Sequence, residues 1–111
     1  MTDAEYVIVL TTLPADHDAG AFARTLVEEH LAACVNIMPE MRSVYRWQGA
    51  LEEETERQIL IKTARARLVQ LWERLRELHP NEVPEFIVLP IVDGNDAYLH
   101  WIADVTATPG T

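Results

Sequence analysis

The segment from His79 to Glu85 gathers groups that could bind a metal ion. His79 ends a predicted helix, and Glu82 and Glu85 follow it closely in the chain. One imidazole with one or two carboxylates suits a borderline divalent cation such as copper or zinc, particularly where a second chain completes the coordination shell. A structural alternative is that the helix dipole favours a protonated His79, which a neighbouring glutamate pairs. His79 and Glu82 are therefore a candidate metal pair, with a charged helix end as the alternative.

Two further side chains could bind a ligand or be purely structural. Cys34 is the single cysteine; its thiolate could ligate copper or zinc, but a lone cysteine between apolar residues is typical of a core position. Lys62 lies in a mostly apolar strand, where it needs a carboxylate or an anionic ligand unless it faces outward. The other histidines, His17, His30 and His100, have the pattern of surface residues.

Hydrophobic periodicity predicts the elements that position these groups. The apolar run Tyr6–Leu10 predicts a central strand buried on both faces, and Asp16 or Asp18 can cap a helix whose apolar stripe extends from Ala19 to Leu31. The rest of the chain predicts a long hairpin of 33–48 with 51–64, a second helix at 65–79 and a buried strand at 86–89. It ends in a last helix with one apolar stripe, formed by Tyr98, Trp101, Ile102 and Val105.

This order, β-α-β-β-α-β plus a C-terminal helix, predicts an α+β ferredoxin-like fold. Such a fold has an antiparallel four-stranded sheet with both main helices on one face. No helical pattern separates Ser43–Trp47 from Ile59–Thr63, which disfavours an alternating open sheet. We expect one domain over residues 1–111, with an ordered core at 5–105 and a flexible tail at 106–111.

The predicted hairpin is too long for its own domain. An arm of about 13 residues reaches about 43 Å, whereas a first helix of about 16 residues reaches only about 24 Å. The overhang carries Val44, Tyr45 and Trp47, and exposed aromatic side chains beside open strand edges favour pairing with another chain. We therefore expect a homo-oligomer; the alternative is that Tyr45 and Trp47 pack back on their own sheet.

Composition excludes several classes of function. The net charge of −9 disfavours nucleic acid and anionic membranes, and 49% hydrophobic residues suffice for a core. The single cysteine and an acidic N-terminus with a five-residue apolar run, Tyr6–Leu10, predict a cytoplasmic protein. No glycine-rich phosphate loop, nucleophile elbow or paired-cysteine motif is present. The acylphosphatase activity that this fold can carry would need an arginine-bearing phosphate cradle, which Thr11–Ala15 lacks.

Five segments together resemble the CutA divalent-cation tolerance family. They keep the order and spacing of that family from about Tyr6 to Asp104, and as a set they are specific: LAACVNI (31–37), SVYRWQG (43–49), LIKT (60–63), HPNEVPE (79–85) and AYLHW (97–101). The resemblance implies a ferredoxin-like homotrimer built by strand pairing along the hairpin, similar to PII-type signalling trimers. It also implies a link to metal tolerance and copper binding, with ligands in clefts between protomers.

The resemblance also implies a set of site residues and three departures. Residues matching the family motifs expected at the cleft are Cys34, Asn36, Tyr45, Trp47, Lys62, His79 and Glu82. Asn81 replaces the usual tyrosine after His-Pro, while Thr11 and Leu78 stand where some copper-binding members have a cysteine and a second histidine. A metal here would therefore use His79 with oxygen ligands.

Several functions fit these observations. The first is a non-enzymatic trimer that binds a metal ion or small anion between protomers, with no obligatory cofactor. The others are a copper chaperone or buffer based on His79 and Glu82, an enzyme using Lys62, His79 and Glu82, and a structural scaffold.

Overall fold

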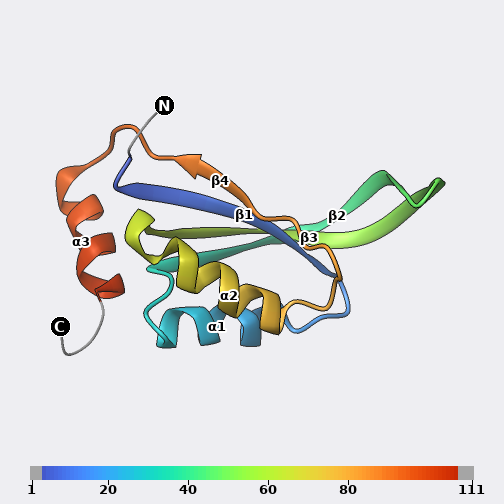
Figure 1. The fold of residues 1–111 in the computed structure, drawn as a ribbon, viewed down its shortest axis with the longest axis horizontal. Coiled ribbons are helices and arrows are strands. Elements are labelled where there is room, and N and C mark those ends of the chain that lie inside the picture. The colour runs from blue at the N-terminus through green and yellow to red at the C-terminus, as the bar shows by residue number, and fades with distance from the viewer. Residues whose placement is uncertain (1–3, 108–111) are drawn as a thin grey trace.

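The computed structural model describes residues 4–107 of the 111-residue chain. The predicted order of elements is confirmed (Figure 1). The elements are β1 (Tyr6–Pro14), α1 (Ala19–Glu28), β2 (Cys34–Trp47), β3 (Ala50–Ala64), a short 3-10 helix η1 (Arg65–Arg67), α2 (Leu68–Leu78), β4 (Ile87–Pro90) and α3 (Asp96–Thr106).

The four strands form one antiparallel sheet in the order β2-β3-β1-β4. β1 pairs with β3 from Tyr6↔Ala64 to Pro14↔Glu56. Helices α1 and α2 cover one face of this sheet, and α3 lies across one end (Figure 1). This is the ferredoxin-like α+β arrangement that the sequence predicted.

The core lies between the sheet and helices α1 and α2. Alternate residues of β1 and β3 face the helices because side chains in a strand alternate between faces. The predicted stripe of α2 meets them, with Leu71 and Leu75 fully buried. The complete buried cluster is Val7, Val9, Leu13, Ala19, Phe22, Leu26, Leu31, Ala32, Ile59, Ile61, Leu71 and Leu75.

Helix α1 begins where predicted but ends early. The Asp18 side chain accepts a hydrogen bond from the N–H of Ala21 at 2.9 Å, which caps the helix. The helix ends at Glu28 because His30 adopts a φ of 61°, and the N–H of Leu31 then bonds the carbonyl of Leu26. The predicted extension to Leu31 was therefore wrong as helix, although Leu31 is buried.

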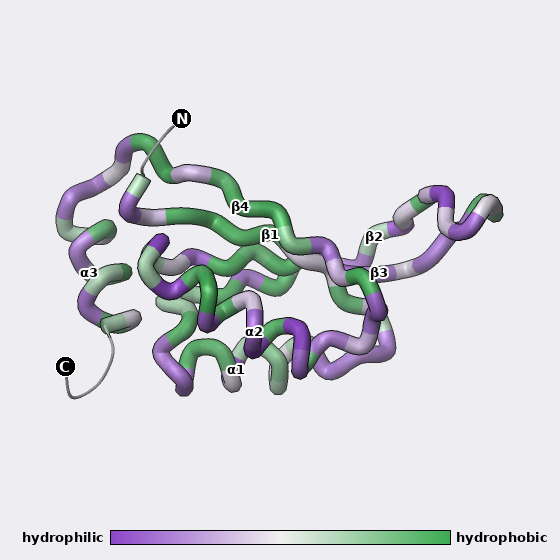
Figure 2. Tube along the Cα trace, viewed as in Figure 1, coloured by the Kyte–Doolittle hydropathy of each residue, from purple (hydrophilic) through white to green (hydrophobic). Residues whose placement is uncertain are grey.

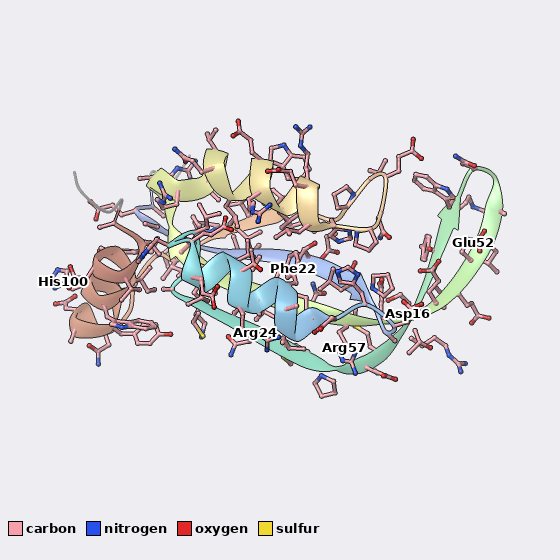
Figure 3. All side chains as sticks on the ribbon, turned by 90° about the horizontal axis from the view of Figure 1, so that it is seen from below. Asp16, Phe22, Arg24, Glu52, Arg57 and His100 are labelled. Atoms are coloured by element: carbon pink, nitrogen blue, oxygen red, sulfur yellow. The ribbon has the colours of Figure 1, made fainter. Side chains whose placement is uncertain are left out.

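The hairpin of β2 and β3 extends beyond the rest of the sheet, as predicted. β1 stops pairing with β3 at Glu56, next to which the Ala15 N–H donates to the Thr55 carbonyl. The part of the hairpin formed by residues 41–56 is here called the arm. The turn at Gln48 and Gly49 has φ values of 49° and 81°, the pattern of a type I′ turn. Figure 2 shows that the body strands are mainly hydrophobic and the arm mainly hydrophilic, and Figure 3 places Glu52 of the arm far from His100 of α3.

The sheet face opposite α1 and α2 is apolar and only partly covered. This open face consists of Ile8, Leu10, Leu60, Ile87 and Leu89, which the strand register brings side by side. Ile87 and Leu89 are 46% and 41% exposed. The prediction that β4 is a buried strand is therefore wrong for the single chain, because the helices cover only the face on which Phe86 and Val88 lie.

Helix α3 buries only part of the stripe that was predicted. Asn95 caps it by accepting hydrogen bonds from the N–H groups of Ala97 and Tyr98. Ile102 and Thr106 are buried, whereas Tyr98 and Trp101 are about 40% exposed. The flexible tail predicted from residue 106 begins too early, because Thr106 is the buried last residue of α3; residues 108–111 lie outside the described part. No helix within residues 4–107 is long and apolar enough to cross a membrane.

Candidate functional site

The predicted site residues fall into two separate groups within one chain. Tyr45, Trp47 and Glu82 line a pocket at the arm, while Cys34 and Lys62 lie at the other end of the hairpin. Cys34 pairs with Lys62 and Tyr45 pairs with Glu52, so the groups are ten residues apart along β3, about 33 Å at the usual rise per residue. The predicted cleft lies between protomers, where the two groups would come from different chains, and it stays a prediction.

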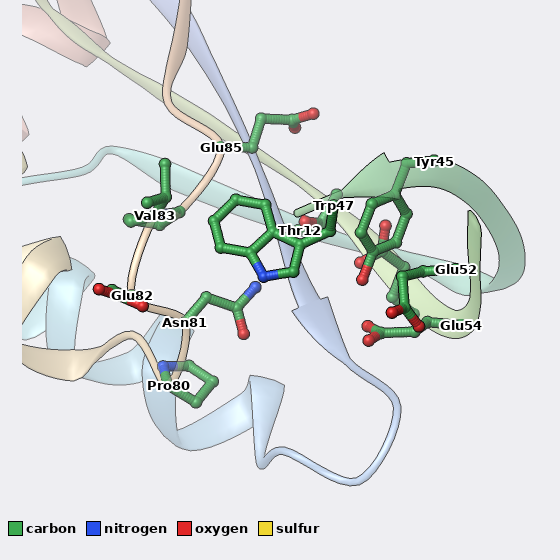
Figure 4. A pocket seen from close by; sticks show the side chains of 12 residues that line it. Thr12, Tyr45, Trp47, Glu52, Glu54, Pro80, Asn81, Glu82, Val83 and Glu85 are labelled. Carbon is green, nitrogen blue, oxygen red and sulfur yellow. The ribbon is translucent and has the colours of Figure 1, made fainter. Parts of the chain in front are cut away.

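The first group lines a pocket between the arm and the loop from Pro80 to Glu85. Its volume is about 710 Å³, a size typical of small-molecule sites. We call it the arm pocket; its lining residues are Thr12, Tyr45, Trp47, Glu52, Glu54, Glu56, Pro80, Asn81, Glu82, Val83, Pro84 and Glu85. Figure 4 shows Tyr45 beside Glu52 and Glu54, and Trp47 between that group and Asn81.

Strand register places aromatic and acidic side chains on one face of the arm. Tyr45 is opposite Glu52 across the hairpin, and Trp47 is opposite Ala50. Since side chains alternate along a strand, Glu52, Glu54 and Glu56 share the face of Tyr45 and Trp47. The signal that sequence reasoning missed is three glutamates at every second position opposite two aromatic residues.

His79 is buried and ties the loop to the sheet. Its Nε2 is 2.6 Å from the carbonyl oxygen of Thr12, and its Nδ1 accepts the N–H of Asn81 at 3.1 Å. Both ring nitrogens are therefore used when the imidazole is neutral with its proton on Nε2. Burial lowers the pKa of His79 below its ordinary value, although the hydrogen bond to Thr12 acts in the opposite direction. The alternative of a protonated helix-end histidine is thus disfavoured, because Nδ1 accepts a hydrogen bond and burial destabilises the charged form.

Gln58 fixes the other end of the same loop. Its side-chain amide donates to the carbonyl oxygen of Thr11 at 2.7 Å and to the carboxylate of Glu85 at 2.8 Å. Together with His79, Gln58 attaches the loop to β1 at adjacent residues. Hydrogen bonds to the body of the protein therefore fix the loop that forms one wall of the arm pocket.

Tyr45 reports the electrostatic environment of the arm pocket. Its hydrogen bond to Glu54, together with desolvation and the charges of Glu54, Glu52 and Glu56, raises the pKa of Tyr45 to about 12. The phenol thus stays neutral, and the negative potential at this face disfavours any further anion. The pocket is suited to a positively charged ligand.

No ready metal centre is assembled in the part of the chain that the structure describes. Within residues 4–107 no group of three or more His, Cys, Asp or Glu side chains is placed to bind one ion. His79 also has no free ring nitrogen. His79 could ligate an ion only by giving up one of these hydrogen bonds, and the metal pair of His79 and Glu82 stays a prediction.

The second group lies beside the open face, near α3. The Cys34 thiol is 3.8 Å from the side-chain oxygen of Asn36, and Lys62 Nζ is 3.5 Å from the hydroxyl of Tyr98 and 5.8 Å from the centre of its ring. The alternative in which Lys62 faces outward is the one observed, and Cys34 is half-buried. No ion pair to Lys62 accompanies these contacts in the described residues, and the ligand-binding role of Cys34, Asn36 and Lys62 stays a prediction.

Comparison with known proteins identifies the family. The sequence profile of the CutA1 divalent ion tolerance protein family matches residues 7–105. This chain belongs to the CutA1 family. A divalent-cation tolerance protein CutA of Thermus thermophilus is 48% identical over 99 residues, 89% of this chain and 96% of that protein. A chloroplastic CutA of Arabidopsis thaliana is 40% identical over 100 residues, 90% of this chain but 55% of that protein.

Solved CutA1 structures have the same fold. CutA1 from a psychrotrophic Shewanella superposes with a TM-score of 0.90 at 35% identity, covering 98% of this chain and 100% of that chain. Two of the departures that the resemblance implied, Thr11 and Leu78, can now be placed in this fold. Thr11 is fully buried on the helix side of β1, its hydroxyl lacks a hydrogen-bond partner among residues 4–107, and Leu78 packs against the core. Neither position faces the arm pocket.

Proposed function

We propose that this CutA1 family member is a non-enzymatic homo-oligomer that binds cations in the arm pocket. The observation that carries the proposal is the convergence of Glu52, Glu54 and Glu56 with Tyr45 and Trp47 on one face of the arm. The net charge of −9 would raise the local concentration of cations around the pocket. Family membership supports the same direction, since its members carry the name of divalent ion tolerance proteins.

A homotrimer is the assembly that we propose, with contacts along the hairpin and the open face. Val44 on the arm is 56% exposed, and Ile87 and Leu89 on the sheet are exposed together with Tyr98 and Trp101 of α3. Apolar surface of this kind beside unpaired strand edges favours association with another copy. A neighbour that covers the arm would also form the outer wall of the arm pocket.

The ligand of the arm pocket is proposed to be a cation rather than a small anion. Five glutamates line the pocket, and its lining contains no lysine or arginine. Copper and zinc remain the metals of choice, bound through carboxylate oxygens with a shell that a second chain completes. A small anion would have to bind beside Lys62 instead.

An enzyme that uses Lys62, His79 and Glu82 together is the weaker candidate. Lys62 pairs with Ile8 of β1, whereas His79 bonds Thr12, four residues further along that strand. This separation is about 13 Å along β1, too far for the two side chains to act on one bond. We therefore propose a binding or regulatory role comparable with that of PII-type trimers. We also propose a cytoplasmic location.

Calorimetric titration of the assembled protein with Cu²⁺ and Zn²⁺ tests this proposal. We expect saturable binding that Glu54→Gln weakens up to about fivefold. The matched control is Glu53→Gln, which removes the same charge from the opposite face of the arm. His79→Gln should leave the stoichiometry unchanged. Absence of saturable binding, or equal losses in both glutamate variants, would contradict the arm pocket as the site, and a 12.6 kDa particle in light scattering would contradict the oligomer.

A further inference from the structure

The structure holds the three glutamates of the arm in a row rather than around one point. Glu52, Glu54 and Glu56 are alternate residues of β3 and lie on one face, so the Cβ atoms of successive glutamates are about 6.6 Å apart. Oxygen ligands of a single ion lie about 2.0–2.6 Å from it and hence within about 5 Å of one another. In the described residues no three such groups converge on one point. The three charges form a line rather than a shell.

A line of negative charges suits a ligand whose positive charges are also in a line. From ordinary C–C and C–N bond lengths, amine nitrogens separated by three or four methylenes are roughly 5–6 Å apart when the chain is extended. This spacing is close to that of alternate glutamates along a strand. The five-carboxylate lining would therefore match two or three ammonium groups at once.

The aromatic wall of the arm pocket suits the same ligand. Tyr45 and Trp47 are alternate residues of β2, and Figure 4 shows both rings lining the space beside Glu52 and Glu54. Aromatic faces cover methylene groups and attract ammonium ions through the ring quadrupole. A bare metal ion would gain nothing from these rings, and the volume of about 710 Å³ is far larger than one ion needs.

The opposite wall is fixed before any ligand arrives. His79 bonds Thr12 and the N–H of Asn81, and Gln58 bonds Glu85, so the loop from Pro80 to Glu85 is attached at both ends. A ligand that enters would thus meet two ordered walls, one aromatic and acidic and one formed by the loop. Pre-formed walls reduce the ordering cost of binding.

We propose that the arm pocket binds a linear aliphatic polyamine, with its ammonium groups along Glu52, Glu54 and Glu56 and its methylenes against Tyr45 and Trp47. The inference rests on the proposed cation site and specifies its ligand class. The affinity depends on the number of ammonium groups in the ligand rather than on one ion pair. Binding is therefore strongly weakened by salt, since exposed charges are screened over about 8 Å at physiological ionic strength.

Calorimetric titration of the assembled protein with spermidine, putrescine and butylamine tests the proposal. Affinity should rise at each added ammonium group. Glu54→Gln should weaken spermidine about 2- to 5-fold, because it removes one exposed ion pair. Trp47→Leu should weaken it by a similar factor, because it removes a ring that interacts with ammonium. Glu53→Gln, of equal charge but on the opposite face, should change it less than Glu54→Gln.

The outcomes separate this inference from the proposed function. Binding of Cu²⁺ or Zn²⁺ that depends on Glu54, without binding of spermidine, would overturn the polyamine and leave the cation site in place. Absence of both would overturn both. Equal affinities for the three amines would contradict the pairing of successive ammonium groups with successive glutamates. Tighter binding of trilysine than of spermidine would assign the pocket to a basic peptide instead.

Discussion

The body and the arm of this protein use the same two strands in different ways. In the body, β3 lies between β1 and β2, and helices bury one side of it around Ile59 and Ile61. Along most of the arm, β3 pairs with β2 alone and presents glutamates to solvent. The comparison indicates that one continuous hairpin contributes to the core at one end and presents an acidic and aromatic surface at the other.

Truncation of a core leucine should give the largest effect. Leu75→Ala removes a fully buried side chain between α2 and the sheet and should lower the free energy of unfolding by about 2–5 kcal/mol. Val44→Ala in the arm should instead act through assembly, so its cost should grow as the protein is diluted. Denaturant unfolding at two protein concentrations measures both. A concentration-independent loss of equal size in Val44→Ala would mean that the arm is part of the folding core.

Acid should destabilise the body through His79. Its pKa is lowered in the folded state, so the unfolded chain binds the extra proton more readily. The contribution of neutral His79 is therefore fully present above its ordinary pKa of about 6.5 and is lost as the pH falls through the lower folded value. Unfolding midpoints measured from neutral to acidic pH should decrease less in His79→Gln than in the wild type. Parallel curves for the two proteins would show that burial of His79 is not linked to stability.

Titration of Tyr45 should give the smallest but most local effect. Tyrosinate absorbance, taken as the difference between the wild type and Tyr45→Phe, should give a pKa near 12. Glu54→Gln should bring that pKa down toward the ordinary value of about 10, and Glu53→Gln should lower it less. A cation bound among the glutamates should lower it too. Identical titrations in both glutamate variants would contradict the hydrogen bond to Glu54.

The elements that depend on local patterns were predictable. The alternation along 34–47 and 50–64 gave the hairpin, and the apolar stripe of α2 gave its buried side, because both follow from the period of the element. β4 was predicted as buried since an Ile-Val-Leu run has the same composition whether its own chain or a neighbour covers it. The early end of α1 depends on the single backbone angle of His30.

The site was less accessible to sequence reasoning because it depends on contacts between distant residues. Tyr45, Trp47 and Glu82 were predicted and line the arm pocket, but Glu54 and Glu56 join them only through cross-strand register and alternation. Sequence reasoning considered His79 as a metal ligand or a charged helix end, because the carbonyl of Thr12 that contacts its Nε2 is 67 positions away in the chain. The separation of Lys62 from this group likewise follows from register.

Strand β3 has no loop between its body half and its arm half, and this continuity limits how the protein can move. It runs unbroken for 15 residues from Ala50 to Ala64. Its pairing with β2 is irregular between Ile37 and Glu40. Widening the arm pocket would therefore bend the hairpin at this irregularity rather than at a loop. A cation bound in the arm pocket would therefore twist the part of β3 that belongs to the body. A neighbouring copy is expected to contact the sheet there.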